Sequence, residues 1–232
     1  MSIISKAPLA DGVSVCLFGA YGTLFDVNTA LSRHGGVLGD KTGPLTSLWR
    51  NRQSEQARKA NQMAEYEDFW YFIGRGLDEV MAELNLDNPV LRAKLLDCFL
   101  CPELYPDVKE VLTALSERNV KTAILSNGSP FMLTSAVTNT GIQDLLKQLI
   151  SVEPARHYLP HPSVYQLAVD ELNSQAGRIC FLSADSGDVA AASDFGLQAV
   201  WINRLGRQWE LPSAPLVHEI STLAELSALL PA

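Results

Sequence analysis

The stretch Val13-Ser-Val-Cys-Leu-Phe-Gly-Ala-Tyr-Gly-Thr23 decides the fold. Residues 13–18 are apolar and rich in β-branched side chains, which is typical of a buried strand in a parallel sheet. From Gly19 onward, small residues predict a tight turn. The sequence thus predicts a strand whose carboxyl end opens directly into a small-residue loop.

Beyond residue 102, helical patterns alternate with short apolar strand patterns. Strands are expected at residues 121–125, 149–152, 179–182 and 199–202. Helices are expected at residues 107–118, 130–139, 162–172, 188–195 and 222–230. This alternation with short connections predicts an α/β fold built on a doubly wound parallel sheet. Ligands of such sheets bind outside the carboxyl ends of the strands, so the site is expected there.

Residues 28–101 differ in character from the sequence on either side. A glycine-rich stretch at residues 35–44 predicts a loop, and most of residues 45–99 carry helical patterns. We therefore expect two domains, a core of residues 1–27 plus 102–232 and an inserted helical cap of residues 28–101. Because the cap follows the first strand, it is expected to lie over the strand ends.

The composition narrows the classes of function. Of 232 residues, 47% are hydrophobic and 19% are charged, which is typical of a globular protein. A net charge of −8 repels phosphate backbones, so no nucleic-acid partner is expected. No apolar stretch is long enough to span a membrane, no secretory signal opens the chain, and four cysteines make no disulfide framework. These features predict a cytoplasmic protein without membrane contact.

Several motifs carry a resemblance to a known family. They are FGAYGTLFDV at residues 18–27, LWR at 48–50, SNG at 126–128, YLPHPSVY at 158–165, FLSADSGD at 181–188 and WINR at 201–204. In this order and spacing they resemble the haloacid dehalogenase superfamily, and more narrowly the type II (S)-2-haloacid dehalogenases. The resemblance spans nearly the whole chain and implies the α/β core with a helical cap.

The departures from that family concern its chemistry. The resemblance implies a nucleophilic aspartate that forms an ester with the substrate, which water then hydrolyses. Gly19 stands at the position of that aspartate, and Leu159 at that of the lysine that steadies it. Asp185 stands where the family has an asparagine. Two losses together favour a natural member that has left the covalent route over a single engineered substitution at Gly19.

The resemblance and the strand-end positions give the candidate site. The candidate catalytic residues are Asp185, Asp188, Thr23 and Tyr165. The candidate substrate-binding residues are Arg50, Ser126, Asn127, Ser183, Tyr21 and Phe69. Two carboxylates as close as Asp185 and Asp188 push their pKa values apart. Asp185 is the expected general base for a water bound at the Gly19 position.

Each candidate also has a purely structural interpretation. The structural roles are a helix cap for Asp188, a satisfied turn for Thr23, packing against the sheet for Tyr165, a capping turn for Ser126 and Asn127, a solvated helix position for Arg50 and core packing for Phe69. The sequence alone leaves both interpretations open.

The sequence predicts no metal and no cofactor. Phosphatases of the resembled superfamily hold Mg²⁺ with two aspartates, whose positions are Gly19 and Tyr21 here. Asp185 and Asp188 alone offer too few oxygen ligands for a tight octahedral site. Cys98 and Cys101 form a single CxxC pair, which does not make a zinc site.

We therefore expect a 2-haloacid-dehalogenase-like hydrolase acting on a small 2-substituted carboxylate, such as a 2-haloacid or a strained ring bearing a carboxylate. Water would attack the substrate directly, because the ester-forming side chain is missing. Two other classes stay open: a catalytically silent fold that binds a small carboxylate or a protein partner, and a lyase or isomerase with Asp185 as base. The resemblance also suggests a homodimer.

Overall fold

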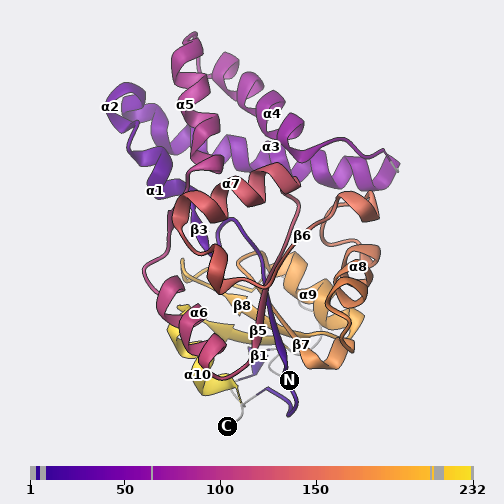
Figure 1. Ribbon diagram of the computed structural model, residues 1–232. Helices are drawn as coiled ribbons and strands as arrows, with labels where there is room; N and C mark the ends of the chain where they lie inside the picture. The colour runs from indigo at the N-terminus through magenta and orange to yellow at the C-terminus, as the bar shows by residue number, and fades with distance from the viewer. Residues whose placement is uncertain (1–3, 6–8, 64, 210, 212–216, 231–232) are drawn as a thin grey trace.

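The computed structural model describes residues 4–5, 9–63, 65–209, 211 and 217–230. A seven-stranded sheet, parallel throughout, forms its centre (Figure 1). The strands run across the sheet in the order β1 (Ile4–Ser5), β9 (Val217–Ile220), β8 (Gln198–Ile202), β7 (Ile179–Ser183), β2 (Val15–Phe18), β5 (Lys121–Ser126) and β6 (Gln148–Ser151). The predicted parallel α/β sheet is confirmed, and the first predicted strand, β2, lies inside it between β7 and β5.

Helices cover both faces of this sheet. They are α6 (Val108–Glu117), α7 (Pro130–Thr140), α8 (Pro162–Leu172), α9 (Ser186–Phe195) and α10 (Leu226–Leu229). Leu17 of β2 belongs to the core cluster that includes α8 and α9, whereas its neighbours Cys16 and Phe18 belong to the cluster of α6, α7 and α10. Both faces are buried, which is why the strand is apolar at every position rather than at alternate positions.

A second group of helices is inserted between two short strands. β3 (Phe25–Asp26) pairs antiparallel with β4 (Glu103–Leu104), and Asp26 lies opposite Glu103. Between them run α1 (Val27–Ser32), α2 (Gly35–Leu38), α3 (Thr42–Met63), α4 (Phe69–Glu83) and α5 (Pro89–Leu100). Figure 1 shows these helices gathered at one end of the molecule. The boundaries proposed for the core and the cap remain a prediction.

The inserted helices pack on one another through buried side chains. Trp49 of α3 is 1% exposed, and its indole Nε1 donates a hydrogen bond to the carbonyl of Ile73 in α4 at 2.9 Å. The loop expected at residues 35–44 is wrong, since α2, the short 3₁₀ helix η1 (Gly39–Lys41) and the first residues of α3 occupy it. Leu38 is buried, so packing stabilises helical backbone despite the low helix propensity of glycine.

Short 3₁₀ helices complete the connections. They are η2 (Gln143–Leu145), η3 (Glu153–Ala155), η4 (Ala176–Arg178) and η5 (Leu223–Glu225). Among the helices within the described residues, the structure contains none with the length and apolar character needed to cross a bilayer.

Candidate active site

A cavity of about 260 Å³ lies between the inserted helices and the carboxyl ends of β2, β5 and β7. Most of the candidate residues line it: Gly19, Tyr21, Arg50, Phe69, Ser126, Asn127, Ser183, Asp185 and Asp188. Thr23 and Tyr165 do not line it. The structure therefore brings nine residues, chosen from four separate sequence motifs and the cap helix α4, to a single site.

Gly19 follows directly after β2, and its N–H donates to the carbonyl of Leu182 at 2.8 Å. A side chain at this position would start between two hydroxyl groups. An ideal Cβ on Gly19 would lie 3.0 Å from Oγ1 of Thr23 and 3.3 Å from Oγ of Ser183. The glycine thus leaves two buried hydrogen-bonding groups facing the position that a nucleophilic side chain would occupy.

Thr23 connects two of the strand-end loops rather than satisfying its own turn. Its Oγ1 accepts a hydrogen bond from the N–H of Ala184 at 3.0 Å, and its side chain is almost fully buried. Because the accepted bond uses only one lone pair, the hydroxyl hydrogen is still available for a group near Gly19.

Asp185 is the N-cap of α9. Its Oδ1 accepts hydrogen bonds from the N–H of Gly187 at 2.8 Å and of Asp188 at 3.1 Å, and the residue is exposed. The helix begins at Ser186, two residues before the predicted start, because this carboxylate satisfies its first amides. The capping role that the sequence assigned to Asp188 therefore belongs to Asp185.

Asp188 occupies a different environment three residues later. Burial raises the pKa of Asp188 well above the ordinary aspartate value, and the negative charge of Asp185 adds to the effect. A hydrogen bond from the Ser183 side chain opposes it by stabilising the carboxylate. The carboxyl group whose pKa is perturbed, and which therefore suits a general base, is that of Asp188.

Tyr165 supports this arrangement from behind. It is fully buried in α8, and its hydroxyl donates to the carbonyl of Asp188 at 2.8 Å. Burial raises the pKa of Tyr165, so the phenol keeps its proton and remains a donor. The structure gives Tyr165 a contact with the backbone of the proposed base and places it outside the cavity.

Polar groups at the end of β5 face the cavity. Oδ1 of Asn127 accepts from the N–H of Leu159 at 2.8 Å, which fixes the amide with its Nδ2 donor on the other side. Oγ of Ser126 accepts from the N–H of Gly128 at 3.1 Å, as in a capping turn. Leu159 itself lines the cavity and makes its wall apolar at the position where the resemblance implies a lysine.

The inserted helices supply the opposite wall. Arg50 of α3 is exposed and donates to Oδ1 of Asn28 at 3.2 Å. Phe69 of α4 is 8% exposed and packs against Tyr158, at a ring-centroid distance of 5.8 Å. The hydroxyl of Tyr21 donates to the carbonyl of Phe99 at 3.0 Å, joining the strand-end loop to α5.

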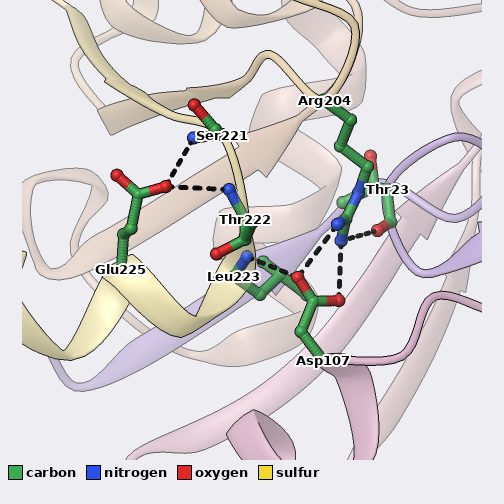
Figure 2. Close-up of polar contacts among 7 residues, drawn as sticks. All are labelled: Thr23, Asp107, Arg204, Ser221, Thr222, Leu223 and Glu225. Atoms are coloured by element: carbon green, nitrogen blue, oxygen red, sulfur yellow. Dashed lines mark hydrogen bonds and ion pairs between the residues drawn. The ribbon is translucent and has the colours of Figure 1, made fainter.

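Sequence reasoning missed a largely buried ion pair beside the cavity (Figure 2). Arg204, which lines the cavity, binds Asp107 through two bonds, NH1 to Oδ2 at 2.9 Å and NH2 to Oδ1 at 3.0 Å. Its NH2 also donates to the carbonyl of Thr23 at 3.1 Å, and its guanidinium lies 3.9 Å from the centroid of the Tyr105 ring. The WINR motif includes Arg204, but its partner Asp107 lies 97 residues away in the sequence, so the motif alone does not reveal the ion pair.

Other cavity residues were missed as well. They are Asn28, Thr46, Gln53, Ser54, Tyr105 and Arg207. Helical spacing from Arg50 would have found Thr46, Gln53 and Ser54, since residues three and four apart share a helix face. Within the described residues, no cluster of three or more His, Cys, Asp or Glu side chains is placed to hold a metal ion.

The family model for haloacid dehalogenase-like hydrolases matches residues 13–196. The chain belongs to this family. The hydrolase is 39% identical over 221 residues to (S)-2-haloacid dehalogenase 1 of Pseudomonas sp. (strain CBS-3), covering 95% of this chain and 97% of the relative.

Two solved structures show how far the hydrolase shares the architecture. A crystal structure described as a dehalogenase has a TM-score of 0.93 at 35% identity, covering 97% of this chain and all of that one. The L-2-haloacid dehalogenase from Xanthobacter autotrophicus with chloropropionic acid covalently bound has a TM-score of 0.85 at 28% identity, covering 94% and 98%.

Proposed function

We propose that this hydrolase cleaves a bond at C2 of a small 2-substituted carboxylate by direct attack of water, without an enzyme ester. The observation that carries the proposal is the surroundings of Gly19. Two buried hydroxyls, of Thr23 and Ser183, flank the position of the missing side chain, and the Ser183 side chain also stabilises the carboxylate form of Asp188. These groups suit a water molecule held beside a base.

The reaction follows from the assigned groups. Asp188, as carboxylate, accepts a proton from the water while the water oxygen forms a bond to C2. The bond from C2 to its substituent breaks, and the substituent leaves with that electron pair, as halide or as a ring atom that takes up a proton. Asp188 then releases its proton to solvent, and the product is a 2-hydroxy acid.

The base assigned here differs from the one expected from sequence. The carboxylate of Asp185 is exposed and accepts two amide hydrogen bonds at the start of α9, so it is engaged as a helix cap. Asp188 is desolvated, and its raised pKa matches the role better. In the proposal Asp185 fixes the start of α9, and so the position of Asp188.

The substrate carboxylate is assigned to donors on both walls. Asn127 offers Nδ2 from the core, and Arg50 offers its guanidinium from the cap. The relatives named as haloacid dehalogenases support a small 2-substituted acid as substrate. A homodimer and a cytoplasmic location remain predictions that accompany this function.

A single-turnover experiment in ¹⁸O-labelled water tests the mechanism. The hydrolase is used in excess over 2-chloropropionate, and in parallel over small cyclic 2-amino acids. Direct attack places ¹⁸O in the product during the first turnover and leaves the protein unlabelled. Label found in the protein, with ¹⁶O in the first product, would overturn the proposal because it requires an ester with an enzyme carboxylate.

The remaining classes give different results in the same assay. A lyase or isomerase forms a product without oxygen from water. A catalytically silent protein forms no product from any of these acids, although small carboxylates still raise its melting temperature. Either result would replace the proposed hydrolysis.

A further inference from the structure

The loop that follows β8 is held by one buried side chain. Asn203 is 5% exposed, and its amide brackets the backbone of Arg207: Oδ1 accepts from the N–H and Nδ2 donates to the carbonyl, both at 2.8 Å. Nδ2 also donates to Oε1 of Glu219 at 2.6 Å. A buried amide satisfied on both atoms fixes where the loop presents Arg207.

The two arginines of this loop have different surroundings. Both line the cavity, but the two terminal nitrogens of Arg204 donate hydrogen bonds to the carboxylate of Asp107 and to the carbonyl of Thr23. Arg207 is exposed and donates from one NH2 to the carbonyl of Ala184 at 2.9 Å. A guanidinium carries five N–H donors, so this contact orients Arg207 and leaves further donors for a ligand.

The position of Arg207 relates it to the proposed reaction. Ala184 lies between Ser183 and Asp185, so Arg207 docks on the segment that leads to the proposed base. Within the described part of the cavity wall, Arg50 and Arg207 are the arginines without a carboxylate partner. One comes from α3 and the other from the core.

We propose that Arg207 is a second carboxylate-binding residue of the cavity, acting on the substrate anion from the core side while Arg50 acts from the cap side. The inference rests on the proposed function for the identity of the ligand. Its physical basis is charge: a carboxylate that enters between two unpaired guanidinium groups gains charge-assisted hydrogen bonds, and an uncharged analogue does not.

A binding measurement tests the role of Arg207 without depending on turnover. Thermal stabilisation is titrated with 2-chloropropionate and with uncharged 2-chloropropionamide, using the wild type, Arg207→Gln and Arg207→Lys. Arg178→Gln is the matched control, because Arg178 is also exposed and also donates to a backbone carbonyl, that of Gly12. Arg178 directly precedes the first residue of β7, whereas the cavity lies at the other end of that strand.

For Arg207→Gln we expect at least tenfold more carboxylate at half-maximal stabilisation, with partial recovery in Arg207→Lys and none of this in Arg178→Gln. In turnover, KM rises by a similar factor while kcat changes less than threefold. Equal carboxylate binding by Arg207→Gln, an equal loss for the amide, or no response of the wild type to the carboxylate would overturn the inference. If the wild type binds the acid without turning it over, the proposed hydrolysis fails, and the binding comparison still decides the role of Arg207.

Discussion

The side-chain amide of Asn61 pairs with the backbone of Tyr158 in both directions. Nδ2 donates to the Tyr158 carbonyl at 2.9 Å, and Oδ1 accepts from the Tyr158 N–H at 2.8 Å. Asn61 belongs to α3, and the next peptide after Tyr158 binds Asn127 through the N–H of Leu159. Two consecutive peptides thus connect the inserted helices to Asn127, the side chain proposed to bind the substrate carboxylate.

Asn61→Ala removes both bonds of that pair. We expect a loss of about 1–3 kcal/mol in the free energy of unfolding, because a partly buried peptide group loses its partners. We also expect KM to rise more than kcat falls, since Asn127 loses its fixed neighbour. Urea denaturation and steady-state kinetics measure both, with Gln62→Ala on the exposed side of α3 as control. Equal effects of the two substitutions would contradict this coupling.

Asp188→Asn and Asp185→Asn test which of the two carboxylates acts as the general base. Loss of a general base costs about 10²–10⁴-fold in rate, so Asp188→Asn should lower kcat by at least a hundredfold. Asparagine caps helices as well as aspartate, so Asp185→Asn should lose less than tenfold and keep its stability. Steady-state kinetics on the accepted substrate decide the matter. A larger loss in Asp185→Asn would return the role of base to that residue.

Asp188 also predicts how the hydrolase responds to pH. Since its pKa is raised in the folded protein, kcat/KM should increase with pH through a range above the ordinary aspartate value of about 4. The folded state holds this proton more tightly than the unfolded chain. Its stabilising contribution is therefore complete at low pH and is lost as the pH rises through the raised pKa. In Asp188→Asn, the free energy of unfolding should fall less over that pH range than in the wild type. An unaltered pH dependence would exclude Asp188 as the cause of the loss of stability.

Gly19→Ala tests the position of the water. The methyl group would lie 3.0 Å from Oγ1 of Thr23, closer than ordinary contact, so we expect a loss of about 1–2 kcal/mol in stability. Turnover should fall at least tenfold as the methyl group displaces water. The double variant Gly19→Asp with Leu159→Lys introduces both side chains that the resemblance implies and should place ¹⁸O in the protein. Full activity of Gly19→Ala would place the nucleophile elsewhere.

Asp107→Asn tests the ion pair of Figure 2. Asp107 binds Arg204 twice and also accepts from the N–H of Leu223 at 2.7 Å, with only 12% of its side chain exposed. Leaving an arginine that is only 11% exposed without its partner costs up to about 3–5 kcal/mol. The exposed pair of Arg92 with Asp78 is the control, and Asp78→Asn should cost less than about 1 kcal/mol. Chemical denaturation measures both.

Local patterns sufficed for much of the fold. The helix predicted at residues 162–172 has the same bounds as α8, because Pro162 starts it and its apolar spacing is regular. β9 was missed, since the four residues Val217–Ile220 carry too short a pattern to stand out. The two-residue strands β3 and β4 exist only through their pairing, which no local pattern reveals.

The site was predictable in membership but less so in roles. Strand ends and motifs located Gly19, Ser126 and Ser183, because parallel strands bring their carboxyl ends together. Which aspartate caps α9 and which is desolvated depends on how the chain packs above them. Two acids three residues apart are equally suited to either role from sequence alone.

Asp26 and Glu103 lie opposite each other in the β3–β4 pair. The inserted helices between them therefore leave the rest of the chain and rejoin it at one place. The inserted helices that form one wall of the cavity can therefore change in evolution, while the strand ends and the start of α9, which position Asp188, stay the same. In the proposed function, the contact that Arg50 of the cap makes with the acid can then change independently of the core residues Asn127, Arg207 and Asp188.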